Sequence, residues 1–251
     1  MNLIRKKIIT SQFGEKESEV FVYTPERQSN KVLFLLKGMY GRYDPITDKV
    51  SSKWDAQFVY HFTKSCYVVC CNTSSKKISP MSDFDARKQA YDGKTFQEEI
   101  SDVELCIQKT EEILKTLGVD KPLFYFFGKS FGGTILLALK QILDAQGIFM
   151  VGSGCGKSET TTRTILRTMP EEAVLLRNIS KYKNGNFHFI RGELDEVVPI
   201  ESQEKIVNSV DESRRDYVVV KGVDHEFEKV NGKYSDFPIT YLIQKVSTSL
   251  M

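Results

Sequence analysis

The first part of the chain alternates apolar and polar residues, whereas later segments contain short runs that are mainly apolar. Residues 4–11 and 19–23 show the alternation on either side of a short polar connection, which is the pattern of a β-hairpin. A run without alternation is typical of a strand that is buried on both faces. Such runs predict six further strands, at residues 32–36, 67–71, 123–127, 147–151, 187–190 and 217–220.

Segments with helical spacing of apolar residues lie between these strands. The clearest covers residues 95–117, where Thr95 and Glu98 have the spacing of a capping box and Gly118 is a natural stop. Helices are also predicted over residues 49–64, 131–143 and 239–250, and over part of 157–182, whereas 72–94 is predicted to be a long irregular loop. Strands that alternate with helices favour an α/β fold, with a mostly parallel central sheet of about eight strands flanked by helices.

The composition is that of an ordinary globular protein. Of the 251 residues, 41% are hydrophobic and 27% are charged, and the net charge is only +2, so neither nucleic acid nor a membrane surface is a favoured partner. We expect no signal peptide and no stable membrane insertion, because no stretch approaches the roughly 18 to 20 apolar residues that span a bilayer. The five cysteines follow no regular spacing, which suggests reduced thiols and a cytoplasmic location.

A glycine-flanked serine follows the predicted strand 123–127 directly. Gly128, Ser130 and Gly132 form a G-x-S-x-G pattern, and a predicted helix comes next. A serine can be presented at the edge of a sheet only on a very tight turn, where neighbouring side chains would clash, so glycines two residues away on either side fit this geometry. The pattern indicates a nucleophilic serine; the alternative is a glycine-rich turn without catalysis.

A nucleophilic serine needs a general base, and the chain contains only three histidines. His61 lies in a predicted helix and His188 in a predicted strand, where a packing or surface role is the simpler interpretation. His225 follows the strand that ends near residue 220. A loop beyond a strand is a suitable place for a base, so His225 is the candidate.

The base in turn needs an acid that orients it, and an acidic loop follows the predicted strand 187–190. Asp195 is the candidate in this loop. Glu193, Glu196 and Asp224 are alternatives that would have to approach the imidazole differently.

A second motif competes with this interpretation. Residues 151–158 resemble a phosphate-binding loop and end in Lys157 and Ser158, but Val151 stands where the pattern requires glycine. No later strand ends in a convincing magnesium-binding aspartate. A nucleotide hydrolase is therefore the less favoured alternative, and these glycines are expected to shape a pocket wall.

The order Ser130, Asp195, His225 resembles that of the α/β-hydrolase superfamily, and residues 192–199 resemble its acid-bearing loop. The resemblance extends from about residue 18 to the C-terminus. It implies an oxyanion hole built from the backbone N–H groups of Phe131 and Met39, with Tyr40 as the next candidate for the second donor. Members often have His-Gly before that donor, where this chain has Lys37 and Gly38.

Together these features predict a serine hydrolase that forms an acyl-enzyme on Ser130. A carboxylic ester hydrolase is favoured, with Tyr40 and Lys129 contacting a small acyl ester or thioester and with no cofactor or metal. A thioesterase, a small peptidase and a noncatalytic hydrolase-like binding protein are the alternatives. Because the candidate residues are spread from 130 to 225, we expect one domain over residues 1–251, with a possible short cap at 158–182.

Overall fold

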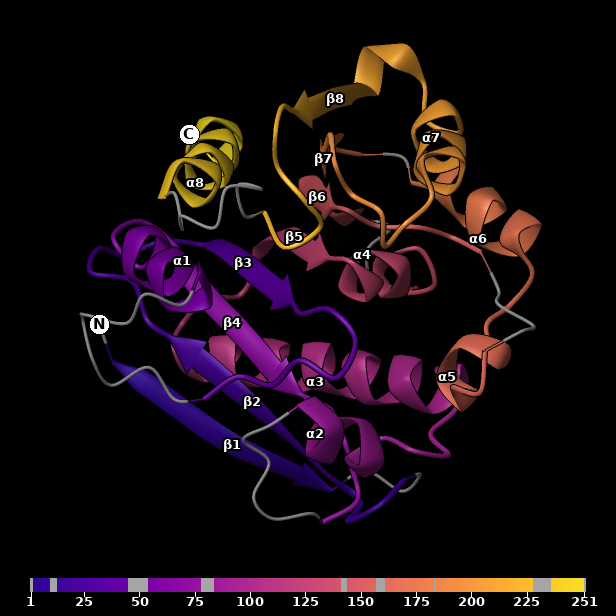
Figure 1. The fold of residues 1–251 in the computed structure, drawn as a ribbon. Coiled ribbons are helices and arrows are strands. Elements are labelled where there is room, and N and C mark those ends of the chain that lie inside the picture. Colours follow the sequence, from indigo (N-terminus) through magenta and orange to yellow (C-terminus); the bar gives the residue numbers. More distant parts are fainter. Residues whose placement is uncertain are drawn as a thin grey trace.

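The structure of the protein, a computed structural model, describes residues 2–9, 13–44, 54–77, 84–140, 144–156, 161–182, 184–227 and 236–250. In this part of the chain eight strands form one sheet in the order β1-β2-β4-β3-β5-β6-β7-β8 (Figure 1). The strands are β1 (Leu3–Ile9), β2 (Glu17–Tyr23), β3 (Lys31–Leu36), β4 (Tyr67–Asn72), β5 (Leu123–Lys129), β6 (Gly147–Val151), β7 (Asn186–Gly192) and β8 (Arg215–Val220). β1, β2 and β4 pair in antiparallel fashion and the remaining pairs are parallel, so the predicted mostly parallel sheet is confirmed.

The central strands are apolar on both faces because each face is covered by helices. Along β3, Val32 and Phe34 pack into one hydrophobic cluster, whereas Leu33 and Leu35 pack into the other. Successive side chains of a strand point to opposite faces, so a strand between two helix layers needs apolar residues at every position. This is why the sequence shows unbroken apolar runs at these strands.

Two helix layers enclose the sheet (Figure 1). One cluster contains buried residues of α3 (Phe96–Thr116), α4 (Phe131–Leu136), α5 (Thr164–Arg167), α6 (Glu172–Ile179) and α7 (Ile200–Asn208). The other contains residues of α1 (Trp54–Phe62) and α8 (Asp236–Leu250). A short 3-10 turn, Glu212–Arg214, precedes β8. None of the helices in the described ranges is long and apolar enough to cross a membrane.

The capping box at the start of α3 is present, since Thr95 Oγ1 accepts the N–H of Glu98 and the Glu98 carboxylate accepts the N–H of Thr95. The helix predicted over 131–143 is shorter than expected. α4 ends at Leu136, and residues 141–143 lie outside the described residues. At this end of α4, side chains from the α6 region donate hydrogen bonds to backbone carbonyl groups. The Tyr182 hydroxyl donates to Leu136 O, and Asn178 donates to Leu137 O.

One loop prediction needs correction, and a helical one is confirmed in the described residues. The stretch 72–94, expected to be irregular, contains α2 (Phe84–Ala90), whose end buries Ala90 and Tyr91 against Tyr40. The segment 157–182 forms α5 and α6 on either side of Pro170, as its helical pattern and its proline suggested. Residues 157–160 lie outside the described residues, as does the start of the helix predicted at 49–64, of which α1 is the described part.

Candidate active site

Ser130 lies in a tight turn between the central strand β5 and α4. Its backbone has φ 53° and ψ −123°, a conformation that non-glycine residues rarely adopt and that stores strain. A Cβ atom on Gly132 would lie only 2.5 Å from Leu36 O, and one on Gly128 would lie 2.5 Å from Gly133 N. The glycines are therefore required by the close approach of backbone segments, and the turn presents the serine at the carboxyl edge of the sheet.

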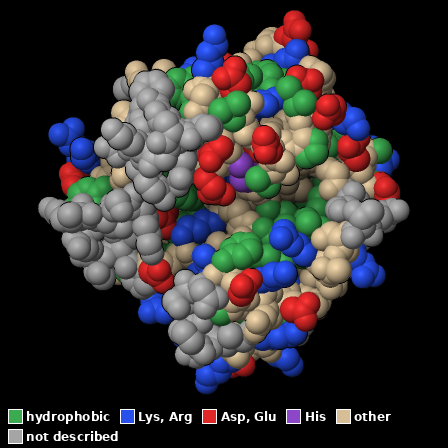
Figure 2. All heavy atoms as spheres, in the orientation of Figure 1, with side chains coloured by type: hydrophobic (Ala, Val, Ile, Leu, Met, Phe, Trp, Pro, Cys, Tyr) green, Lys and Arg blue, Asp and Glu red, His purple; other side chains and the backbone are tan. Residues whose placement is uncertain are grey.

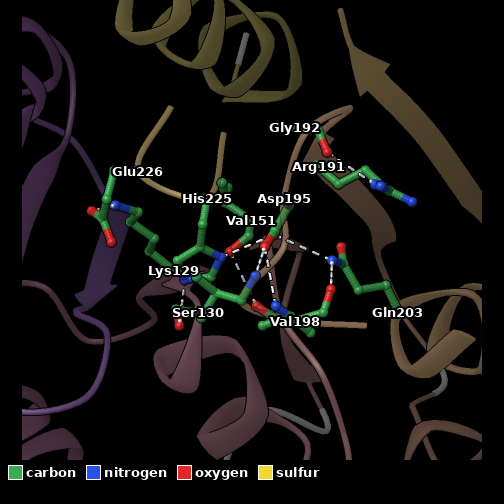
Figure 3. Close-up of polar contacts among 12 residues, drawn as sticks. Lys129, Ser130, Val151, Arg191, Gly192, Asp195, Val198, Gln203, His225 and Glu226 are labelled. Carbon is green, nitrogen blue, oxygen red and sulfur yellow. Dashed lines mark hydrogen bonds and ion pairs between the residues drawn. The ribbon is translucent and has the colours of Figure 1, made fainter. Parts of the chain in front are cut away.

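The structure brings Ser130, His225 and Asp195 into one hydrogen-bonded row (Figure 3). Nε2 of His225 lies 2.9 Å from Ser130 Oγ, and Nδ1 lies 2.9 Å from Asp195 Oδ2. The histidine is 6% exposed and the aspartate 8%. Their shielding from water strengthens the electrostatic interaction along the row.

Asp195 is held by several donors besides His225. Its Oδ1 atom accepts the N–H groups of Val197 and Val198 at 3.0 and 3.1 Å, and Oδ2 accepts Nε2 of Gln203 at 3.3 Å. Burial acts to raise the pKa of this carboxyl, but the hydrogen bonds from His225 and the two backbone N–H groups outweigh it and hold the pKa below its usual value. The carboxylate is thus kept ionised beside the imidazole.

Gln203 was not predicted from the sequence. It lies in α7, is 5% exposed, and also donates to Val198 O at 3.1 Å. No local motif marks a glutamine eight residues after an aspartate, so only the packing of α7 against the acid loop identifies it.

Of the acidic candidates, Asp195 contacts His225 Nδ1 through Oδ2. Glu193 instead accepts the N–H of Gly222 at 2.9 Å and thereby joins the acid loop to the histidine loop. The backbone reinforces this junction, because Leu194 N–H donates to Val223 O. Glu226, next to the histidine, forms an ion pair with Lys129, so the predicted substrate-contacting lysine is engaged by the protein itself (Figure 3).

The loop after β3 passes close to Ser130. A Cβ atom on Gly38 would lie 3.3 Å from the Ser130 Cβ, which places the backbone of this loop beside the serine. Within the described residues, neither the N–H of Met39 nor that of Phe131 donates to a protein acceptor. Both predicted donors are thus available for an oxyanion.

Lys37, which replaces the histidine common at this position, holds the loop in place. Its Nζ lies 2.7 Å from Asp55 Oδ2 in α1 and 4.2 Å from the ring centroid of Tyr43. The same Nζ donates to Arg42 O, at the far end of the loop. Lys37 therefore connects the two ends of this segment and anchors it to the helix layer.

Tyr40 is buried beside the main cleft and is not among the described residues that line it. It has a positive φ of 61° and is 7% exposed. Its ring packs 5.9 Å from Phe84 and 5.7 Å from Tyr91. Tyr40 lines two small cavities of about 30 and 40 Å³ beside the main cleft, so its contact with a substrate stays a prediction.

A cleft of about 990 Å³ opens over Ser130 and His225. The segment predicted as a cap forms one wall of it, through Arg163, Leu166 and Met169. The glycine-rich segment after β6 forms another part, through Gly154 and Gly156. Lys157 and Ser158 of the competing phosphate-loop motif lie outside the described residues. The volume is ample for a small organic molecule, since ligand pockets commonly occupy about 300 to 1,000 Å³.

Cysteine chemistry and metal binding have less support than the serine site in the described residues. All five cysteines are buried and none forms a disulfide. Burial raises the pKa of Cys155, the one in the loop that borders the cleft, to about 11, so its reactive thiolate is scarce at neutral pH. No three His, Cys, Asp or Glu side chains in the described ranges gather into a metal site.

A second buried polar network lies close to the same edge of the sheet. Lys94 is fully buried, and its Nζ lies 2.6 Å from Glu99, 2.8 Å from Asp102 and 2.8 Å from the carbonyl of Ser74. Burial acts to lower the pKa of Lys94, but the two carboxylates outweigh it and hold the pKa above its usual value. The network joins the segment after β4 to the start of α3.

No model of a known protein family matches the sequence, and no curated protein is detectably similar to it. Solved structures nevertheless share its architecture. The peroxisomal α/β-hydrolase Lpx1 of Saccharomyces cerevisiae superimposes with a TM-score of 0.67 at 12% identity, over 99% of this chain and 89% of that one. Dienelactone hydrolase of Anabaena variabilis gives 0.64 at 15% identity, over 99% and 97%. The esterase domain of a Rhodothermus marinus protein gives 0.59 at 11% identity, over 99% and 97%.

At this level of identity the similarity shows the fold. The chain has the α/β-hydrolase fold, as the resemblance in its motifs implied.

Proposed function

We propose that the protein is a serine hydrolase that cleaves carboxylic esters through an acyl-enzyme intermediate. The observation that supports this most strongly is the hydrogen-bonded row of Ser130, His225 and Asp195, which begins on a strained turn and opens into a cleft. A nucleophile, a base within hydrogen-bonding reach and an acid that orients the base are the three parts that acyl transfer requires.

In the first half of the reaction, Ser130 Oγ forms a bond with the ester carbonyl carbon while its proton passes to His225 Nε2. The tetrahedral intermediate then expels the alcohol, which receives that proton from the imidazolium. In the second half, water gives a proton to His225 and attacks the acyl-enzyme, and the acid product leaves as Ser130 regains its proton. Asp195 holds the imidazole in the required tautomer throughout and stabilises its cation.

The negative charge on the carbonyl oxygen needs donors that are in place before the reaction. The backbone N–H groups of Phe131 and Met39 are suited to this role, because they border Ser130 and make no other hydrogen bond in the described part of the chain. Donors of this kind typically contribute about 10²- to 10³-fold to kcat each.

The choice of an ester rather than a thioester or a peptide rests on the shape of the site and on the similar structures. The cleft is broad, and its wall at residues 161–182 is short. Among the proteins with similar structures are an esterase and a dienelactone hydrolase. The thioesterase and small peptidase alternatives use the same residues and differ in substrate.

Labelling with a fluorophosphonate tests the nucleophile. We expect the wild-type protein and a Ser180→Ala control to be labelled and Ser130→Ala to remain unlabelled; Ser180 is an exposed serine at the end of α6. An unlabelled wild type, or labelling that persists in Ser130→Ala, would contradict the proposal and favour a noncatalytic binding protein. A parallel panel of acyl esters, thioesters and aminoacyl amides would then rank the three activities.

A further inference from the structure

The basic side chains that line the cleft differ in how they are neutralised. Each cleft lysine is paired with a carboxylate: Lys37 with Asp55, Lys129 with Glu226 and Lys205 with Glu172. A carboxylate partner offsets the charge of such a lysine, so it attracts an anionic ligand less strongly than a cation without a carboxylate partner would. Two arginines, Arg87 and Arg163, also line the cleft in the described part of the chain.

Arg163 has no carboxylate partner among the described residues. One of its N–H groups points to the sulfur of Met39 at 3.6 Å, and its guanidinium lies 5.7 Å from the ring centroid of Tyr40. Sulfur is a weak acceptor, and a guanidinium carries five N–H donors in a planar fork. A partly buried arginine thus retains most of its hydrogen-bonding capacity in a cleft that shields it from water.

Arg163 lies close to one of the two residues expected to supply oxyanion donors. It contacts the side chain of Met39, and Phe131 and Leu166 line the cleft near it. Figure 2 shows Lys and Arg side chains below the central hollow and Asp and Glu side chains above it, beside a histidine. Apolar side chains thus lie beside basic ones on this side of the cleft.

We propose that Arg163 binds a carboxylate of the substrate, and that the substrate is a half-ester of a dicarboxylic acid. This inference rests on the proposed hydrolase function. The guanidinium fork matches the two oxygens of a carboxylate, while Met39, Phe131 and Leu166 provide apolar surface for the carbon chain between the carboxylate and the ester. An ester with an uncharged acyl chain of equal length leaves Arg163 without its partner.

Matched pairs of substrates test this specificity. The 4-nitrophenyl half-esters of adipic and suberic acid are compared with 4-nitrophenyl hexanoate and octanoate, which have the same numbers of acyl carbons. We expect kcat/KM of the wild type to favour the half-esters by roughly 10- to 100-fold, as a hydrogen-bonded charge typically gives. Arg163→Met should abolish this preference and Arg163→Lys should retain part of it. Arg167→Met, which changes an exposed arginine at the last residue of α5, the helix that Arg163 precedes, should keep it in full.

Equal rates for both members of a pair in the wild type, or a preference that survives Arg163→Met, would overturn the proposal. Binding without turnover separates the two hypotheses. In the Ser130→Ala background, calorimetric titration with monomethyl adipate should show at least about tenfold weaker binding once Arg163→Met is added. Arginine-dependent binding in a protein whose wild type hydrolyses no ester would support the anion site and refute the hydrolase. Turnover of both ester types without preference would support the hydrolase and refute the anion site.

Discussion

The molecule contains two buried polar networks, and the comparison between them shows how the proposed reactive site differs from a structural one. In the first, Asp195 and His225 are 8% and 6% exposed; in the second, Asp102 and Lys94 are 1% and 0% exposed. Both offset buried charge with hydrogen-bond or ion-pair partners, as burial requires. The difference is where each network ends. The first ends on the hydroxyl of Ser130, which faces the cleft, whereas the second ends on the carbonyl of Ser74 inside the protein.

This difference determines what a proton can do in each network. Lys94 is held charged by two carboxylates. It therefore keeps its proton, and the network acts as a fixed cross-link. His225 lies between an ionised carboxylate and a neutral hydroxyl, so it can accept a proton on one side while it is stabilised from the other. Substitutions in the two networks should therefore separate activity from stability.

The largest effect is expected for His225→Ala. Loss of the base should lower ester kcat/KM by about 10⁴- to 10⁶-fold, as in serine hydrolases whose base is removed. Asp195 would keep its donors Val197, Val198 and Gln203, so urea unfolding should show only a small change in stability. An activity loss below about tenfold would contradict the assignment of the base.

Lys94→Met should have the next largest effect, on folding rather than chemistry. Removing the cation leaves Glu99 and Asp102 as buried charges without their partner, and breaking a buried ion pair in this way costs about 3–5 kcal/mol. Urea denaturation measures this loss, and the specific activity of the folded fraction should stay within a few-fold of wild type.

The double variant Lys94→Met/Asp102→Leu is the control for the lysine network. It removes one of the uncompensated charges, so it should recover part of the lost stability. If Lys94→Met lowers the free energy of unfolding by less than about 1 kcal/mol relative to wild type, the network is not the structural cross-link inferred from its contacts.

Gln203→Leu should have a smaller effect, confined to the positioning of the acid. The variant loses the hydrogen bonds to Asp195 Oδ2 and Val198 O, each typically contributing about 1 kcal/mol. We expect kcat to fall by roughly 3- to 10-fold while KM stays unchanged, because Gln203 does not line the cleft. A rise in KM without a fall in kcat would show that the side chain acts on binding instead.

The smallest effect is expected for Glu226→Gln. The Lys129–Glu226 pair bridges the serine turn and the histidine loop, but Glu226 is 65% exposed, and exposed ion pairs contribute about 0–1 kcal/mol. The change in unfolding free energy should be below about 1 kcal/mol and should shrink further in high salt. A large loss of activity would show that this pair positions His225.

The sequence was sufficient where the signal is local. Apolar runs identified the strands, and Gly128, Ser130 and Gly132 identified the turn, because strand burial and steric crowding act on neighbouring residues. The elements that the sequence did not predict depend on contacts between segments far apart in the chain. The ring of Tyr40 packs against Phe84 in α2 and against Tyr91 just after it. No pattern within residues 72–94 predicts that contact.

The residues that support the site were missed for the same reason. Gln203 reaches Asp195 from α7, and Lys37 reaches Asp55 from the loop after β3. Each contact joins elements whose relative position is set by the whole sheet. A glutamine or lysine in isolation has no spacing rule that predicts its partner, so these contacts become visible only once the fold is assembled.

The backbone of Ser130 has a further consequence. A positive φ at a non-glycine residue costs about 1–3 kcal/mol, and glycine adopts that conformation without the penalty. At this position the residue that best serves thermal stability differs from the one that supplies a hydroxyl. Selection or design for heat resistance alone would therefore favour Ser130→Gly, and would yield a more stable protein that had lost its proposed nucleophile.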